Sequence, residues 1–418
     1  MIHIRDTIQS GTKLSRIKDM ATRTYGSVFF KKQVAGTLEQ VPDGRFAFTY
    51  APSYLVGDGA QIAYTLPRQA EPHYSFGLHP FFDNLVAEGW LARAQARALG
   101  IRGDDRFARL LAFGLDCPGA VSVVDPKPAS TPDLTHGTGE EIAALTNRAS
   151  ISGVQPKLFA VQEGKKFRPA QRGEPSTHIA KLPSPELEHL VELEYLTTSA
   201  ARVLLPTDEI VEVEIAPVEK IHGECLLVRR FDRMGSGEKI HFEEFNQLLA
   251  RPSEAKYEGS YGEMAGFIRE QQTQQREIDI DKLFRRVLVC ILLGNNDAHS
   301  KNFALLYTQE GFRLGPFYDV VAPSVYPRFR RTGLALKITP GTNPHSLSDI
   351  GPKHLSLLAK SFGLNNAALE LAVSDLKRQL GAAKEAVRES KIGSAQLKKQ
   401  LIDLMGKRWN GTFASIGK

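Results

Sequence analysis

The spacing of apolar residues predicts strands in the first part of the chain. Between residues 25 and 66, aromatic and β-branched residues alternate with polar ones in YGSVFFKKQVAGTLEQ, GRFAFTYA and QIAYTLP. The turn sequences PDG and GDG separate these three runs. Alternation with a period of two residues, bounded by such turns, predicts short strands joined by tight connections.

A helical pattern follows between residues 80 and 115. FFDNLVAEGWLARAQARALG and DDRFARLLAFGL place apolar residues three and four positions apart, which predicts two amphipathic helices. Asp104 and Asp105 are candidates for the N-cap of the second helix. The strands and helices together predict a small α+β subdomain over residues 25–125. Residues 1–24 precede it as an extension, with a loose helical spacing that predicts a frayed or partner-docked helix.

The remainder of the chain changes from a strand pattern to a helical one. Residues 126–147 are rich in Pro, Thr, Ser and Gly and predict a linker. KLFAVQ, FRPA, THIAKLP, EIVEVEIAPV and CLLVRRFD then read as strands, with one helix in PELEHLVELEYLTTSAARVLL. Helical spacing follows in EEFNQLLA, GEMAGFIREQQ and DIDKLFRRVLVCILLG, and two more helices lie between residues 365 and 408. A strand-rich lobe (148–232) and a helical lobe (233–418) are therefore expected.

Composition narrows the class of protein. The 418 residues are 42% hydrophobic and 24% charged, which excludes a disordered, collagen-like or coiled-coil chain for the bulk of the sequence. The three cysteines are widely spaced and form no CxxC pair, so a zinc site or a disulfide framework is not expected. The longest apolar run, Val287 to Leu293, is far shorter than the ~20 residues of a membrane span. We expect a cytoplasmic protein with no membrane partner.

The net charge of +6 is a property of the chain ends. Residues 377–418 hold ten Lys or Arg and three Asp or Glu, whereas residues 25–376 hold 38 basic and 42 acidic residues. The body of the protein is therefore not a basic surface for nucleic acid. Contact with DNA is expected from the terminal segments or from a partner, although a basic helical face is usually just solvated.

The segment GNNDAHSKNF carries the first candidate chemistry. Asp297 and Asn302 stand in D-x-x-x-x-N register directly after an apolar helix. Protein kinases use this spacing for a base that accepts the substrate hydroxyl proton and for an amide that binds Mg²⁺. Taken alone, the pattern is common and fits a helix cap followed by a turn equally well.

A second acidic residue follows in the order that kinases use. Asp319 lies seventeen positions after Asn302, beyond two predicted strands, FALLYTQ and GFRLG. Kinases place their second metal-binding Asp on such a hairpin. One carboxylate and one amide are enough for Mg²⁺ when phosphates complete its coordination shell.

Two features upstream complete the series. Lys181 ends the strand THIAKLP, where an ammonium group would neutralise nucleotide phosphates. Glu188, Glu192 and Glu194 on the following helix are candidates to pair with it, and Glu194 is the predicted partner. Before this strand lies SISGVQPK, a short Gly-containing loop whose backbone N–H groups can hold phosphate. By itself this loop would be an ordinary turn.

These motifs in this order resemble the HipA-type serine/threonine kinases, toxins of bacterial toxin–antitoxin pairs. The resemblance rests on SISGVQPK, THIAKLP, LLVRRFDR, LLGNNDAHSKNF and PFYDVV. VFFKKQVAGTLE, GRFAFTY, YTLPR, FFDNLVAEG and DRFARLLAFGLDCPGAVSV resemble the N-terminal subdomain of the same family. The similarity covers about residues 25–375. It implies an α+β, bilobal protein-kinase-like fold with a strand-rich N-lobe, a helical C-lobe and a small N-terminal subdomain.

The resemblance also implies roles for individual residues. Asp297 would be the catalytic base, and Asn302 and Asp319 would bind Mg²⁺. Ser150 would match the loop serine that such kinases autophosphorylate to switch themselves off, with Ser152 as a second candidate hydroxyl. The residues implied in ATP binding are Ser152, Gly153, Val154, Gln155, Lys157, Lys181, Arg229, Phe231, His299, Lys301, Asn302 and Asp319. Arg229 stands in the adenine hinge where family members can carry an acidic residue.

The partners implied are a helix-turn-helix antitoxin (HipB-like), operator DNA mainly through that antitoxin, and a protein substrate. The resemblance allows an aminoacyl-tRNA synthetase as that substrate and a homodimer within the antitoxin complex. Two alternatives stay open at this point. One is a small-molecule or lipid kinase on the same scaffold, and the other is a catalytically silent regulator that binds antitoxin and DNA.

Overall fold

The computed structural model describes residues 25–127, 138–146, 155–235, 237–271, 273–342 and 345–417. The chain divides into two compact units. The N-terminal unit is made of Met1–Leu182, Pro217–Gly223 and Asp232–His241, and the C-terminal unit of Pro183–Ala216, Glu224–Phe231 and Phe242–Lys418. The helix expected over residues 1–24 lies outside the described residues. The domain boundaries expected from the sequence stay a prediction.

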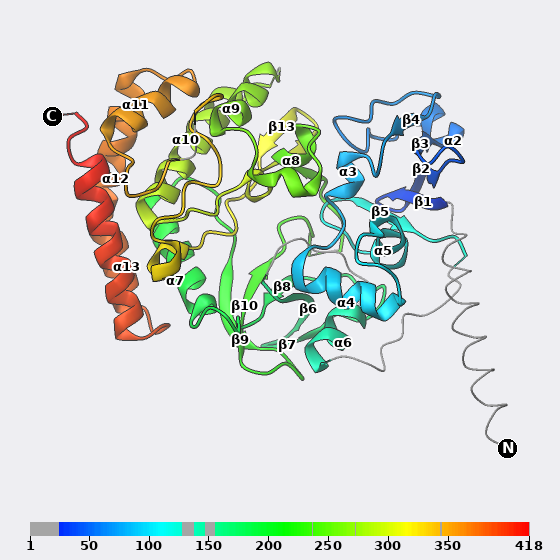
Figure 1. The fold of residues 1–418 in the computed structure, drawn as a ribbon, viewed down its shortest axis with the longest axis horizontal. Helices are drawn as coiled ribbons and strands as arrows, with labels where there is room; N and C mark the ends of the chain where they lie inside the picture. The colour runs from blue at the N-terminus through cyan, green and yellow to red at the C-terminus, as the bar shows by residue number, and fades with distance from the viewer. Residues whose placement is uncertain are drawn as a thin grey trace. The chain divides into compact units, whose positions relative to one another are not determined.

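A five-stranded antiparallel sheet forms one part of the N-terminal unit (Figure 1). Its strands, in spatial order, are β4 (His73–Ser75), β3 (Phe46–Tyr50), β2 (Gln33–Gln40), β1 (Tyr25–Phe30) and β5 (Val121–Val124). The strands predicted from YGSVFFKKQVAGTLEQ and GRFAFTYA are therefore confirmed. Apolar residues of the sheet pack with those of the nearby helices in one core that includes Val28, Phe48, Phe82, Leu110 and Val123.

The strand predicted from QIAYTLP is wrong. The segment forms only an isolated bridge between Ala63 and Leu66. Two of its backbone groups bond instead to a buried side chain, because the Tyr50 phenol donates to the Leu66 carbonyl at 2.7 Å and accepts from the Ile62 N–H at 3.2 Å. The apolar alternation of this segment therefore reports burial, not membership of a sheet.

The helix predicted over FFDNLVAEGWLARAQARALG is interrupted. It consists of α3 (Pro80–Asp83) and α4 (Gly89–Leu99), and a short helix α2 (Pro52–Val56) precedes them. The carbonyls freed at the break are taken by the next helix, α5 (Arg106–Phe113), since Arg106 donates to the Asp83 carbonyl and Arg109 to the Ala87 carbonyl. Of the two predicted N-caps, Asp105 caps α5 by accepting from the Ala108 N–H at 2.9 Å.

A second group of strands in the N-terminal unit carries residues predicted for the active site. β7 (Lys166–Pro169), β6 (Lys157–Glu163) and β8 (His178–Lys181) are antiparallel neighbours. Within residues 126–147, which are predicted as a linker, the structure forms the helix α6 (Gly139–Thr146), and the linker itself stays a prediction. Arg233, almost fully buried, ties segment 232–241 into this unit through the Asp116 carboxylate at 2.5 Å and the Cys117 carbonyl at 2.9 Å.

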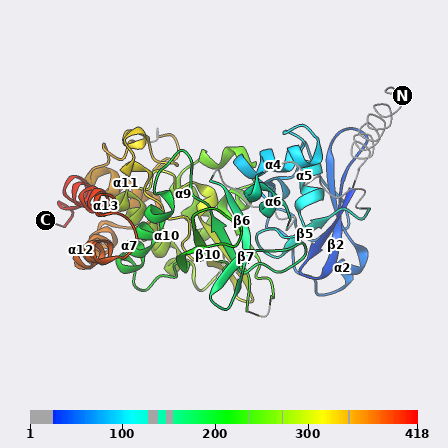
Figure 2. The same cartoon turned by 90° about the horizontal axis from the view of Figure 1, so that it is seen from below.

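The C-terminal unit is mainly helical. Figures 1 and 2 show α12 beside both α7 and α13. Its helices are α7 (Leu190–Leu204), α8 (Phe245–Leu248), α9 (Tyr261–Glu270), α10 (Arg276–Leu293), α11 (Pro352–Ser361), α12 (Asn366–Glu389) and α13 (Ala395–Arg408). Short turns are η1 (Ser253–Tyr257), η2 (Ser300–Asn302), η3 (Pro323–Val325), η4 (Pro327–Phe329) and η5 (Trp409–Phe413). Among the described residues, no helix is long and apolar enough to cross a membrane.

The strands of this unit belong to two groups. β9 (Val213–Pro217) and β10 (Glu224–Arg229) are neighbours, and β11 (Phe242–Glu244), β12 (Ala304–Thr308) and β13 (Gly311–Leu314) form a three-stranded antiparallel sheet. The helix predicted over EEFNQLLA therefore starts later than expected. Residues 242–244 pair with β12, and α8 begins only at Phe245.

The buried side chain of Arg286 on α10 fixes the backbone that follows β13. Its guanidinium forms two 2.7 Å bonds to the Asp208 carboxylate and donates to the Gly315 carbonyl at 2.7 Å. The same group lies 5.4 Å from the ring centre of Phe317. The Arg286 and Asp208 side chains are 1% and 5% exposed, so removal of one partner would leave a buried charge without its counter-ion.

We predict that Arg286→Met lowers the free energy of unfolding by about 3–5 kcal/mol, the usual cost of breaking a buried ion pair. Lys399→Met is the matched control, because the Lys399–Asp403 pair is exposed on both sides. Its loss should cost at most about 1 kcal/mol. Urea denaturation followed by circular dichroism compares the two variants, and equal losses would contradict the argument.

Burial of His241 predicts a pH dependence of stability in the N-terminal unit. His241 packs edge-on against Phe30 and Phe81, and burial lowers its pKa to about 3 from an ordinary 6.5. The unfolded chain takes up this proton below pH 6.5, whereas the folded chain does so only near pH 3. Stability is therefore complete above pH 6.5 and should fall by about 2 kcal/mol between pH 6.5 and pH 5 through this group.

His241→Asn removes the titrating group and keeps an acceptor for the Ala120 N–H, which bonds to Nδ1 of His241. Urea midpoints measured at pH 7.5 and pH 5 should therefore differ less in the variant than in the wild type. If the change in urea midpoint between the two pH values is the same in the variant and in the wild type, His241 accepts its proton in the folded state.

Candidate active site

Asp297 lies on a tightly bonded loop at the end of α10. The helix stops at Gly294, which adopts a left-handed φ of 83°. Beyond it, the Asp297 N–H donates to Asn295 Oδ1 at 3.0 Å, and Asn296 Nδ2 donates to the Phe329 carbonyl at 2.9 Å. The loop therefore holds a half-buried carboxylate on a defined backbone.

The two predicted metal ligands are in direct contact. Asn302 Nδ2 donates to Asp319 Oδ2 at 2.5 Å, and Asn302 Oδ1 accepts from the His299 N–H at 3.0 Å. Asp319 has a φ of 58°, a left-handed conformation that Asp tolerates better than most residues. An amide and a carboxylate side by side are a donor set that fits a hard cation such as Mg²⁺.

The turn η1 supports this loop through side chains that the sequence analysis did not single out. The Tyr257 phenol donates to Asp297 Oδ1 at 2.9 Å, and the Ser300 hydroxyl donates to the Lys256 carbonyl at 2.9 Å. Lys301 Nζ donates to the Ser253 hydroxyl at 3.2 Å. No motif spacing marks η1, since it lies about 40 residues before the loop.

The residues between Asp297 and Asn302 are buried. Lys301 is 3% exposed, and its ammonium lies 3.7 Å from the Glu244 carboxylate in addition to its bond with Ser253. His299 is 8% exposed and packs edge-on against Tyr257, with ring centres 5.1 Å apart. Both side chains thus contact residues of η1. Their role in nucleotide binding stays a prediction.

Phe231 of the predicted hinge lies close to the residue before Asp319. Its ring centre is 5.6 Å from that of Tyr318, and the Tyr318 phenol donates to the Lys301 carbonyl at 2.8 Å. Arg229 behaves differently, because its exposed guanidinium pairs with Glu212 at 2.8 Å. Within the C-terminal unit, the aromatic ring of the hinge is therefore connected to the loop, whereas the arginine side chain faces solvent.

Two buried lysines face one another in the N-terminal unit. Lys157 on β6 and Lys181 on β8 are register partners and are 7% and 8% exposed. Side chains directly opposite on antiparallel strands lie on the same face, so two cationic groups share one buried region. Gln155 Nε2 donates to the Leu182 carbonyl at 2.9 Å, beside this pair in the chain. Ser150, Ser152, Gly153 and Val154 lie outside the described residues.

Burial distinguishes the three glutamates predicted as partners of Lys181. Glu194 on α7 is 2% exposed, Glu192 is half-buried beside His189, and Glu188 is exposed before the helix begins. The Lys181–Glu194 pair stays a prediction. A further residue of α7 was missed: the Thr197 hydroxyl donates to the Val320 carbonyl, directly after Asp319. The signal in the sequence was that Thr197 is a polar residue on an otherwise apolar helix face, one turn beyond Glu194.

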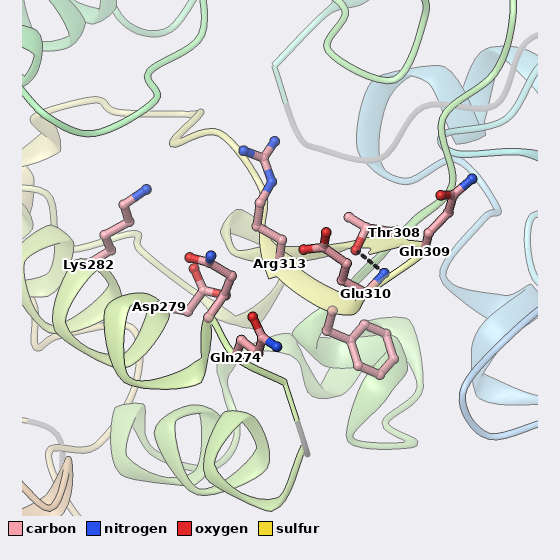
Figure 3. A pocket seen from close by; sticks show the side chains of 9 residues that line it. Gln274, Asp279, Lys282, Thr308, Gln309, Glu310 and Arg313 are labelled. Atoms are coloured by element: carbon pink, nitrogen blue, oxygen red, sulfur yellow. Dashed lines mark hydrogen bonds between the residues drawn. The ribbon is translucent and has the colours of Figure 1, made fainter.

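A hollow of about 440 Å³ on the C-terminal unit shares no residue with the predicted set (Figure 3). It is lined by Gln274, Gln275, Asp279, Lys282, Thr308, Gln309, Glu310, Phe312 and Arg313. The buried Asp279 carboxylate accepts from the Leu314 N–H at 3.0 Å, and burial raises its pKa. This carboxylate therefore joins α10 to β13 and has a structural role.

Comparisons with known proteins agree with the order of these elements. The family model of the HipA N-terminal domain matches residues 26–124, and that of the HipA-like C-terminal domain matches residues 149–384. The serine/threonine-protein kinase toxin HipA of Shewanella oneidensis is 30% identical over 64% of this chain and 68% of its own length. Y4dM of Sinorhizobium fredii is 28% identical over 75% of this chain and 79% of its own length.

Among solved structures, this chain is similar to one in the Shewanella oneidensis MR-1 complex of HipA, HipB and its operator DNA. The TM-score is 0.76 at 24% identity, covering 94% of this chain and 99% of that one. The likeness confirms the kinase-like fold class, with its strand-rich and helical parts. Since both domain models match in chain order and together cover most of the sequence, the chain belongs to the HipA family of serine/threonine protein kinases.

Proposed function

We propose that this protein is an ATP- and Mg²⁺-dependent serine/threonine kinase that acts as the toxin of a type II toxin–antitoxin pair. The observation that carries the proposal is the arrangement of Asp297 on its bonded loop with Asn302 and Asp319 in contact nearby in the same unit. This is the set that phosphoryl transfer to a hydroxyl requires: one base and two oxygen ligands for a metal.

Each residue of this set would have one task. Asp297 would accept the proton of the acceptor hydroxyl as the γ-phosphoryl group is transferred to its oxygen. Asn302 would offer Oδ1 and Asp319 a carboxylate oxygen to Mg²⁺, whose charge neutralises the phosphate oxygens. In the absence of the cation, the hydrogen bond between Asn302 and Asp319 keeps the two side chains together. Binding of the cation would replace this bond.

The remaining residues would hold the nucleotide. Lys181 and Lys157, both buried, would supply two positive charges for its phosphates, and Glu194 would orient Lys181. The loop from Ser152 to Gln155 would cover the phosphates with backbone N–H groups. Arg229 and Phe231 would bind adenine through hinge backbone groups, as the family resemblance implies.

Autophosphorylation would switch the enzyme off. A phosphate on Ser150 or Ser152 adds a charge of about −2 to the loop that would hold the ATP phosphates. Like charges cannot share that site, so the loop would have to leave it. The loop serine would thus be both a substrate and a brake.

The partners follow from the family. The similar Shewanella chain was solved with HipB and operator DNA, which supports a helix-turn-helix antitoxin as the partner here. DNA would be contacted mainly through that antitoxin, because residues 25–376 are net acidic. The substrate whose phosphorylation arrests growth would be a host protein, with an aminoacyl-tRNA synthetase as the first candidate to test.

Incubation of the pure protein with Mg·ATP should add phosphate to Ser150 or Ser152, mapped by mass spectrometry. Asp297→Asn removes the base and keeps the size of the side chain. The rate of autophosphorylation should therefore fall by at least about 100-fold, and growth arrest should fall with it. Toxicity that survives Asp297→Asn would contradict a kinase mechanism. A wild-type protein that neither binds ATP nor carries phosphate afterwards would contradict the proposal itself.

Asp319→Asn tests the metal site separately. Asn also tolerates the left-handed φ of 58°, so the backbone should stay in place while the carboxylate is lost. Calorimetric titration with ATP should show that Mg²⁺ strengthens binding to the wild type and has little effect on the variant. An unchanged Mg²⁺ effect in Asp319→Asn would show that Asp319 is not a metal ligand.

A further inference from the structure

Tyr257 at the end of η1 bonds to the Asp297 carboxylate from outside the loop. Its phenol donates to Oδ1 at 2.9 Å. The ring is about half exposed, and it packs edge-on against His299 with Lys256 Nζ 5.5 Å from its centre. A phenol O–H is therefore aimed at the group proposed as the catalytic base.

The phenol is held in place by the rest of η1. Ser300 donates to the Lys256 carbonyl, and Lys301 donates to the Ser253 hydroxyl, so the turn is bonded to the same loop at two further points. In the next helix, the Tyr261 phenol donates to the Ala298 carbonyl at 3.1 Å. A phenol on a turn that is fixed in this way restricts the orientation of the Asp297 carboxylate, whereas a mobile surface tyrosine would not.

We infer that Tyr257 is a positioning residue for phosphoryl transfer, an inference that rests on the proposed kinase function. The bond from the phenol to Oδ1 limits the rotation of the Asp297 carboxylate, which has to present an oxygen to the acceptor hydroxyl. The same bond favours the ionised carboxylate, which is the form that can accept a proton. Tyr257 therefore sets both the direction and the charge state of the base without touching the substrate.

Titratable groups of the described residues around Asp297 include, besides Lys301 of the loop, side chains from three elements. Tyr257 and Lys256 belong to η1, Tyr261 to α9, and His299 to the catalytic loop itself. Removal of the Tyr257 hydroxyl takes away one hydrogen-bond donor and changes none of the formal charges. A shift in the pH dependence of Tyr257→Phe would therefore report on this single bond.

The test is the initial rate of autophosphorylation of the full chain as a function of Mg·ATP concentration, at several pH values. Tyr257→Phe should lower the maximal rate about 10-fold, because a base turned from its direction transfers the proton less often. The ATP concentration for half-maximal rate should stay within about 2-fold, and the acidic limb of the pH–rate profile should move to higher pH.

Tyr307→Phe is the matched control, since the Tyr307 phenol bonds to the Glu243 carboxylate elsewhere in the same unit. Its rate and pH profile should equal those of the wild type, and the Tm of both variants shows whether they are folded. A wild-type rate and pH profile in Tyr257→Phe would overturn the inference. A higher rate would also overturn it, because the phenol would then be blocking the base. Absence of phosphorylation in the wild type would overturn the proposed function and this inference together.

Discussion

The buried ion pair between Arg286 and Asp208 is the interaction on which the geometry of the candidate site depends. The ion pair fixes the Arg286 guanidinium, which also donates to the Gly315 carbonyl. In this way α10 holds the backbone four residues before Asp319. The same helix ends at Gly294 and leads directly into the loop of Asp297. Arg286 and Gly294 are eight residues apart on one helix, about 12 Å along its axis. One rigid element therefore sets the positions of both the proposed base, Asp297, and a proposed metal ligand, Asp319.

Other contacts stabilise the same two segments, the loop of Asp297 and the backbone at Asp319. Thr197 on α7 binds the Val320 carbonyl, so the helix that carries Glu194 is joined to the backbone of Asp319. Tyr257 and its neighbours in η1, 40 residues earlier in the chain, bind the loop of Asp297. Phosphoryl transfer relies on positioning and electrostatics more than on covalent chemistry, so a site of this kind gains from being tied at several points.

The sequence predicted the elements well where periodicity and caps agreed. Asp105 caps α5, and the apolar run before Gly294 forms α10 as expected. The predictions failed where side chains took over backbone hydrogen bonds. Tyr50 replaces the sheet partners expected for QIAYTLP, and Arg106 and Arg109 stabilise the break within the helix predicted after residue 80. These side-chain hydrogen bonds depend on residues that meet only in the folded chain.

By itself, the sequence determined the order of the motifs, and with it the family and the residues to examine as base and metal ligands. It could do so because those residues lie close together in the chain, at spacings that phosphate chemistry restricts. Only the tertiary structure decided which side chains hold them. Tyr257 and Asp297 are 40 residues apart, Arg286 and Asp208 are 78, and Thr197 and Val320 are 123. Contacts over such separations leave no periodic trace in a single sequence, because they are formed by packing of whole elements and not by local backbone preference.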